Sequence, residues 1–166
     1  EYLHKLEAVA CPSAGSCGGQ FTANTMACVS EAIGLALPGS SGAPAPYESR
    51  DHYAELSGQA VMELIANGGP RPRDIVTLAA LENAAKVVAA SGGSTNAALH
   101  LPAMANEVGI DFDLHAVAEI FRATPYIADL KPGGKYVAKD MYDVGGVPVL
   151  MKTLLDAGVL DGSCIT

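Results

Sequence analysis

The chain has 166 residues, of which 49% are hydrophobic and 17% are charged, and its formal net charge at pH 7 is −8. This length and apolar content are typical of one folded domain with its own core, and they argue against an intrinsically disordered chain. The excess of acidic residues argues against nucleic acid and anionic membranes as partners, and no apolar run reaches the ~20 residues that a membrane-spanning helix needs.

Apolar residues recur at helical spacing through most of the chain, between turns rich in glycine and proline. The pattern predicts helices over residues 22–37, 47–67, 78–91, 97–108, 114–121, 136–144 and 147–157. The expected N-caps are Thr22 or Asn24 for the first helix, Asp74 or Thr77 for the third and Asp113 for the fifth. Residues 124–130 form the best candidate strand. These elements fit an α/β fold, a helix-rich fragment of a layered α/β/α domain with few strands, and leave an all-α fold open.

The four cysteines, Cys11, Cys17, Cys28 and Cys164, are not preceded by a signal peptide. Cysteines of secreted domains form disulfides, whereas those in a reducing compartment stay free or bind metals. We therefore expect an intracellular, cytoplasmic protein. The chain starts without Met and its last residues form no terminating element, so we also expect that either end is a cut.

Residues 10–26 combine two thiols, several small residues and the start of a helix. A cysteine just before a helix lies near the positive end of the helix dipole, which favours the ionised, metal-binding thiolate. Cys11 and Cys17 are separated by five residues, a wider gap than in a zinc knuckle, and no matching Cys/His pair follows. On spacing alone, metal ligation and simple burial explain these cysteines equally well.

A second Gly/Ser/Thr turn, residues 92–96, also precedes a predicted helix. Ser94, Thr95 and Asn96 are candidate substrate-side residues because a helix N-terminus suits a carboxylate, but helix capping explains them without any ligand. Asp129 and Lys131 are either a solvated pair or part of a substrate-side wall. The histidines have no metal-ligand spacing, and one of them lies in an apolar pattern typical of a structural residue; they are His4, His52, His115 and, in the apolar pattern, His100.

Three groups of motifs carry a family resemblance. They are CPSAGSCGG (11–19) with FTANTM (21–26), EAIGL (31–35) and LPGS (37–40); GGSTNA (92–97) with LHL (99–101); and PYIADLKPGG (125–134) continuing to GGVP (145–148). Together they resemble the dihydroxy-acid dehydratase family of iron-sulfur dehydratases, and the resemblance covers essentially the whole chain. It implies that residues 1–166 are a single partial domain, an internal segment of the larger N-terminal α/β domain of such an enzyme.

The resemblance also implies cofactors. In the family three cysteines hold an iron-sulfur cluster, more often 2Fe-2S than 4Fe-4S, and the last of the three corresponds to Cys17. The other two lie upstream, one within a Cys-Asp-Lys motif that this chain lacks. Gly15, Gly18 and Gly19 would let the backbone approach the inorganic sulfides, while Cys11 is interpreted as a structural neighbour. The Mg²⁺ ligands and the serine base fall outside the chain, so no catalytic residue is expected within it.

The activity implied by the resemblance is the dehydration of a 2,3-dihydroxy carboxylic acid of the dihydroxyisovalerate type to a 2-keto acid, in branched-chain amino-acid biosynthesis. A cluster iron would act as Lewis acid on the departing hydroxyl. The expected partners are this small molecule and, in a full-length enzyme, further copies in a homodimer or higher homo-oligomer. Two alternatives are a sugar-acid (aldonate) dehydratase of the same superfamily and, for the segment alone, a catalytically empty folding or interaction module. The segment alone is expected to be inactive and to hold no stable cluster.

Overall fold

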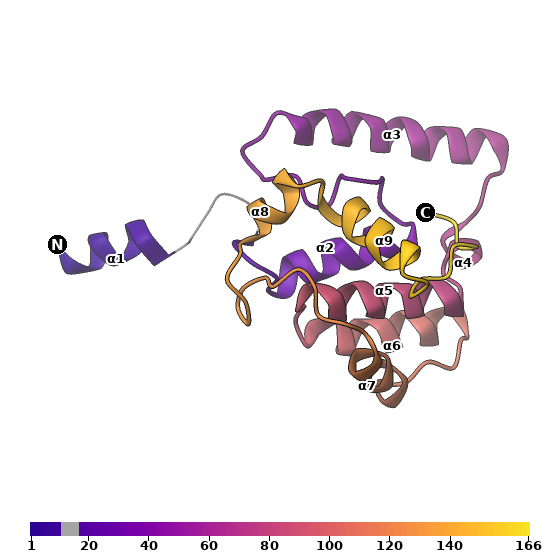
Figure 1. Ribbon diagram of the computed structural model, residues 1–166. Coiled ribbons are helices and arrows are strands. Elements are labelled where there is room, and N and C mark those ends of the chain that lie inside the picture. The colour runs from indigo at the N-terminus through magenta and orange to yellow at the C-terminus, as the bar shows by residue number, and fades with distance from the viewer. Residues whose placement is uncertain (11–16) are drawn as a thin grey trace.

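The computed structural model of the protein describes residues 1–10 and 17–166 (Figure 1). In these residues the chain forms helices joined by turns and by longer loops over 34–48 and 124–137. The helices are α1 (Tyr2–Ala10), α2 (Thr22–Ile33), α3 (Ser49–Asn67), α4 (Pro72–Ile75), α5 (Leu78–Ser91), α6 (Asn96–Val108), α7 (Leu114–Ala123), α8 (Ala138–Asp143) and α9 (Gly146–Asp156). The predicted helices all exist, with ends that differ by a few residues.

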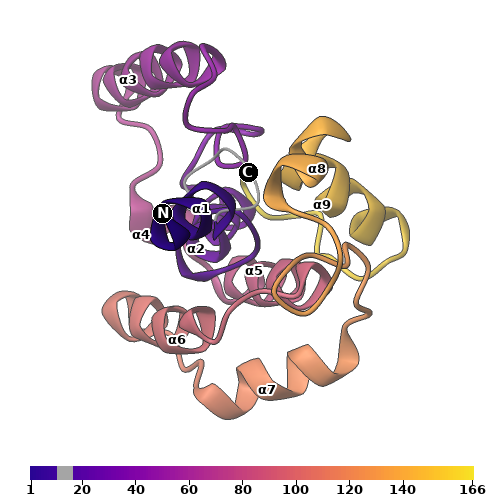
Figure 2. The same ribbon diagram turned by 90° about the vertical axis from the view of Figure 1, so that its left-hand side faces the viewer.

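Helix α5 is the centre of the core. It packs against α2, α6 and α7, and α9 packs against α2. Figure 2 shows α6 and α7 on one side of α5, with α8 and α9 on another. The alanines of α5 let the neighbouring helices approach closely, and larger apolar side chains fill the spaces between the helices. The largest fully buried apolar side chains include Ile33 of α2, Leu81 and Val88 of α5, Leu101 of α6 and Leu154 of α9.

Two predicted N-caps are confirmed by hydrogen bonds. The Thr77 hydroxyl accepts from the Ala80 backbone N–H at 3.2 Å, and the Asp113 carboxylate accepts from the Ala116 N–H at 2.9 Å. Each bond satisfies an N–H group that the first turn of its helix leaves without a partner. Local sequence therefore determines where α5 and α7 begin.

The first predicted helix was too long at its C-terminal end. Helix α2 ends at Ile33 because Gly34 adopts φ 95° and donates its N–H to Glu31 and Ser30 carbonyls. The buried Glu31 carboxylate then accepts from the Gly39 backbone N–H at 2.6 Å and from Ser41, which ties the following turn to the helix. A left-handed glycine and a buried carboxylate thus override the apolar spacing that continues towards residue 37.

The predicted strand at 124–130 is wrong. In the described residues the recorded β pairing is an isolated bridge between Leu130 and Tyr136. The backbone N–H groups of Ile127 and Ala128 instead donate to the Ala90 carbonyl at the end of α5, at 2.9 and 3.0 Å. Apolar composition favours a strand only where a partner strand is at hand, and here the segment lies against a helix end. The described residues are helix-rich, and a layered α/β/α arrangement stays a prediction.

Helix α3 confirms the predicted helix 47–67, and it lies outside the core. Figure 1 shows it running above the rest of the helices, and none of its residues is buried. Helix α1 is exposed along its whole length and projects from the body in the same view. None of the helices in the described ranges has the length and apolarity that a membrane crossing requires.

Candidate functional site

The described part of the cysteine loop, residues 17–21, leads into the N-terminus of α2. Cys17 is a half-buried free thiol, and Gly18 and Gly19 are buried. Phe21, with φ −82° and ψ −162°, is the residue at the N-cap position, and its side chain makes no capping bond. The expectation that Thr22 or Asn24 caps this helix is therefore wrong, since both lie inside it. Cys11 and Gly15 lie outside the described residues.

The loop between α7 and α8 packs directly on the cysteine loop. The Gln20 backbone N–H donates to the Lys131 carbonyl at 2.6 Å, and the Ala138 N–H donates to the Gly18 carbonyl at 3.3 Å. A Cβ on Gly19 would lie 2.7 Å from the Lys131 carbonyl oxygen, closer than such atoms approach. Glycine at position 19 is thus required by this close approach, whether or not a cofactor is bound.

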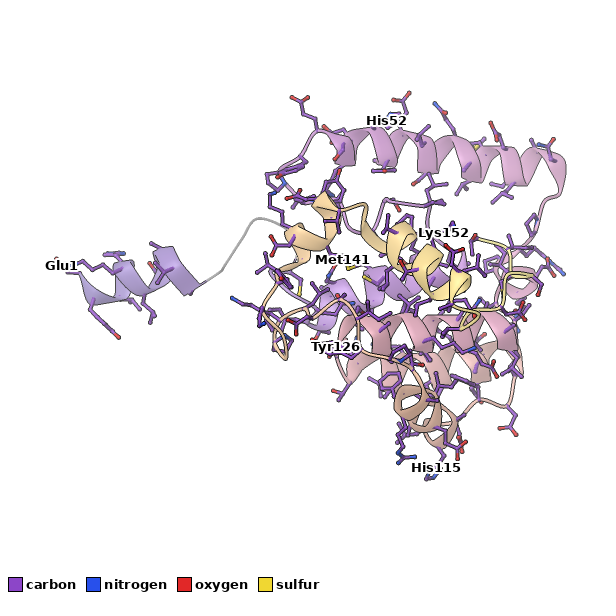
Figure 3. All side chains as sticks on the ribbon, viewed as in Figure 1. Glu1, His52, His115, Tyr126, Met141 and Lys152 are labelled. Carbon is purple, nitrogen blue, oxygen red and sulfur yellow. The ribbon has the colours of Figure 1, made fainter. Side chains whose placement is uncertain are left out.

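The residues from Asp129 to Tyr136 form a tight loop. Asp129 has φ 48°, and its carbonyl accepts from the N–H groups of Lys135 at 2.9 Å and Tyr136 at 3.0 Å. The Lys131 N–H donates to the Tyr136 carbonyl at 2.8 Å. Tyr126 and Met141, labelled in Figure 3, lie before and after this loop. Lys131 is therefore held beside the cysteine loop through its backbone, and the two interpretations of its side chain stay open.

A buried polar network lies beneath the cysteine loop. The Gln20 side-chain Nε2 donates to the Ser91 hydroxyl at 2.8 Å, and its Oε1 accepts from Asn24 Nδ2 at 2.7 Å. The Cys28 thiol also faces Gln20 Oε1, at 3.9 Å. Within the described residues, no buried side-chain nitrogen or oxygen lacks a hydrogen-bond partner. The network joins the cysteine loop to the end of α5 and was not predicted, because nothing local shows that Gln20 and Ser91 meet.

The turn before α6 lies on the same end of α2. The Ser94 backbone N–H donates to the Thr25 hydroxyl at 2.9 Å, and that hydroxyl donates to the Gln20 carbonyl at 3.3 Å. The Ser94 hydroxyl accepts from the Asn96 N–H at 3.2 Å, whereas Thr95, at the N-cap position, makes no side-chain capping bond. The structure thus links the two predicted sets, Cys17 to Gly19 and Ser94 to Asn96, through Gln20 and Thr25. Polar residues on the buried side of α2 were the signal that could have found this link.

Potential metal-ligating side chains are scattered over the described residues. No group of three or more His, Cys, Asp or Glu side chains there is arranged to hold a metal ion. His52 on α3 and His115 on α7 lie on opposite sides of the body (Figure 3). Cys17 is free and partly exposed, so its sulfur fits one ligand position of a cluster whose other ligands come from elsewhere. Within the described residues, Cys17 is therefore the side chain of this loop that could ligate a metal ion or cluster.

Cys28 is expected to be far less reactive than Cys17. Burial raises the pKa of the Cys28 thiol from 9.0 to about 11; its hydrogen bond to Gln20 opposes this shift, and the charge of Glu31 adds to it. This shift lowers its thiolate fraction near neutral pH about 100-fold. We expect iodoacetamide at pH 8 to label Cys17 at least ~100-fold faster than Cys28 in the folded, cofactor-free full-length protein, as followed by peptide mass spectrometry. Equal labelling rates would show that α2 does not bury Cys28.

Because of this pKa shift, the contribution of Cys28 to the stability of the fold depends on pH. Folding favours the protonated Cys28 thiol, so its contribution to stability is complete below pH 9.0 and is lost as the pH rises towards about 11.

Comparison with known proteins places the chain in a family. The family model described as "Dihydroxy-acid/6-phosphogluconate dehydratase N-terminal" matches residues 1–166. A protein of Parvibaculum lavamentivorans named dihydroxy-acid dehydratase is 74% identical over the whole chain, which spans 29% of that protein. A protein of Pelagibacter ubique with the same name is 73% identical over 99% of the chain, which spans 28% of that protein. A protein of Nocardia farcinica named dihydroxy-acid dehydratase 1 is 53% identical over 97% of the chain, which spans 28% of it. The chain belongs to the dihydroxy-acid/6-phosphogluconate dehydratase family and corresponds to its N-terminal region.

Proposed function

We propose that the full-length protein containing this chain is a hydro-lyase that converts a 2,3-dihydroxy carboxylic acid of the dihydroxyisovalerate type to a 2-keto acid, in branched-chain amino-acid biosynthesis. The observation that carries the proposal is the junction at the start of α2, where the Cys17 loop and the Ser94 turn meet in a chain 74% identical to a dihydroxy-acid dehydratase. The reaction removes the C2 proton and the C3 hydroxyl as water, and the resulting enol becomes the ketone.

In this proposal Cys17 is one thiolate ligand of an iron-sulfur cluster, of the 2Fe-2S type. When bound, the cluster supplies a Lewis-acidic iron that weakens the bond to the departing hydroxyl, and Mg²⁺ held by residues outside the chain supplies a second charge for the substrate. Gly18 and Gly19 are the proposed cofactor-side glycines next to Cys17, and a Cβ on Gly19 would lie 2.7 Å from the Lys131 carbonyl oxygen, so this part of the loop packs closely only with glycine. We place the protein in the cytoplasm as a homodimer or higher homo-oligomer, with this segment inside a layered α/β/α domain.

Ser94, Thr95 and Asn96 are the proposed substrate-side residues. The start of α6 presents N–H groups and a positive dipole end, to which a carboxylate binds favourably. The Asn96 N–H is taken by the Ser94 hydroxyl, while Thr95 makes no capping bond with its own side chain. The Thr95 hydroxyl therefore does not cap its own helix, which suits a residue that contacts substrate.

The experiment that tests this function is turnover by the purified full-length protein. We expect formation of the 2-keto acid from 2,3-dihydroxyisovalerate, with little product from a sugar acid such as gluconate. Product from gluconate alone would replace the proposal with the aldonate alternative, which the family description also covers through 6-phosphogluconate. The 166-residue chain assayed in parallel should give no product and retain no iron, because its described residues supply a single ligand at this site.

A further inference from the structure

Thr25 lies in the first turns of α2 and is fully buried. Its hydroxyl oxygen bonds to two segments, a nearby one at Gln20 and one at Ser94, which is 69 residues away from Thr25 in the chain. It donates to the Gln20 carbonyl at 3.3 Å, on the cysteine-loop side, and accepts from the Ser94 backbone N–H at 2.9 Å, on the side of the α6 turn. One atom therefore joins the two halves of the site.

The methyl group of Thr25 contacts the same turn. Its Cγ2 lies 3.2 Å from the position that a Cβ on Gly93 would occupy, and Val88 Cγ1 lies 2.6 Å from that position. Gly93 is thus enclosed between α2 and α5 and has no room for a side chain. The methyl of Thr25 fills space beside Gly93, whereas its hydroxyl makes the hydrogen bond to the Ser94 backbone.

A second hydrogen-bonded link also starts at Gln20, but it ends at Ser91 in α5 and not at Ser94. Gln20 Nε2 bonds to the Ser91 hydroxyl, and that hydroxyl in turn bonds to the Val87 and Val88 carbonyls at 2.8 and 3.1 Å. This link attaches the cysteine loop to the body of α5, before the turn begins. Of the two links, the Thr25 hydroxyl is the one that reaches Ser94 itself.

We propose that Thr25 is a positioning residue whose hydroxyl sets the placement of the Ser94 turn relative to the Cys17 loop, and with it the register of the substrate against the cofactor. The inference rests on the proposed function for its catalytic consequence. Because Thr25 is fully buried, it touches neither substrate nor cofactor and acts through Gln20 and Ser94. A change of about 1 Å in such a placement can lower the rate ~100-fold.

The test uses two variants of the full-length protein that separate the effect of the Thr25 hydroxyl from that of its methyl group. Thr25→Val keeps the shape and removes the hydroxyl, whereas Thr25→Ser keeps the hydroxyl and removes the methyl group. Thr153→Val is the control, since it removes a hydroxyl that bonds only to the Val149 carbonyl of its own helix. If Thr25→Val does not accumulate as folded protein, Thr25→Ala takes its place with the same expectation.

The first readout is amide hydrogen exchange in the cofactor-free protein, measured by mass spectrometry on peptides covering residues 91–97. We expect Thr25→Val to speed exchange at Ser94 at least ~10-fold, since its N–H loses its acceptor, with α5 and α7 unchanged. Thr25→Ser and Thr153→Val should match the wild type. Unchanged exchange at Ser94, or an equal rise throughout α2 and α5, would overturn the proposal.

The second readout is turnover of 2,3-dihydroxyisovalerate per intact cluster at saturating substrate. We expect Thr25→Val to lower kcat per cluster about 10- to 100-fold, with iron content retained and with recovery in Thr25→Ser. Normal kcat and KM per cluster in Thr25→Val would mean that Thr25 serves stability alone, and the proposal would be wrong. A wild type that dehydrates neither substrate refutes the proposed function instead, and the exchange readout still decides whether Thr25 holds the turn.

Discussion

Replacing Gly134 by alanine is expected to lower the free energy of unfolding of the full-length protein by about 3 kcal/mol. A Cβ at this position would lie 2.0 Å from the Asp129 carbonyl oxygen and 2.1 Å from its carbon. Both atoms are backbone, and the same oxygen accepts from Lys135 and Tyr136, so the loop has to open to make room. Urea unfolding of the cofactor-free variant and the wild type, side by side, measures the loss.

Gly133 provides a matched control in the neighbouring position. A Cβ on Gly133 meets no atom within 4 Å, so Gly133→Ala is expected to change stability by less than ~0.5 kcal/mol. The Lys131 carbonyl in this loop accepts from Gln20, so Gly134→Ala should also disturb the cysteine loop, whereas Gly133→Ala should not. Equal unfolding midpoints for the two alanine variants would contradict the described loop.

Replacing Cys17 by alanine is expected to lower the proposed dehydratase activity of the full-length protein more than ~100-fold. Changing a residue that only supports a metal ligand already lowers metal affinity or activity about 10- to 100-fold. Cys17 is partly exposed and lies outside the hydrophobic core cluster, so its loss should leave the fold intact. Steady-state turnover, with circular dichroism as the check on folding, measures both quantities.

Cys28→Ala is the control for the loss of a thiol. Cys28 is in the core cluster, and Gln20 Oε1 keeps its hydrogen bond from Asn24 when the thiol is removed. This variant should lose some stability yet retain most of its activity per folded chain. Comparable activity losses in Cys17→Ala and Cys28→Ala would argue against a special role for Cys17.

The parts of the fold that depend on local chemistry could be predicted from the sequence. Thr77 and Asp113 accept from N–H groups three residues away, and such bonds are visible in a short stretch of sequence. Gly34 shows the limit of this reasoning, because apolar residues continue the helical spacing past the point where a left-handed glycine ends α2. The strand expected at 124–130 failed for a related reason, since its N–H groups found the Ala90 carbonyl rather than another strand.

The candidate site was only partly predictable. Cys17 was singled out by the family resemblance, since its spacing alone left burial and metal ligation equally open, and Ser94 was singled out because it lies in a glycine-rich turn before a helix. Their connection depends on Thr25 and Ser94, which are 69 residues apart, and on the Gln20 network beneath them. Tertiary packing decides such contacts, and no periodicity or spacing in one sequence specifies them.

The central claim is that Cys17 anchors an iron-sulfur cluster in the full-length protein. The most direct measurement is the iron and acid-labile sulfide content per chain of Cys17→Ser, Cys28→Ser and wild type, each isolated and reconstituted anaerobically in the same way. We predict stoichiometric iron and sulfide in wild type and in Cys28→Ser, and a nearly complete loss of both in Cys17→Ser. A wild-type content of iron and sulfide in Cys17→Ser, with an unchanged visible absorption spectrum, would contradict the account.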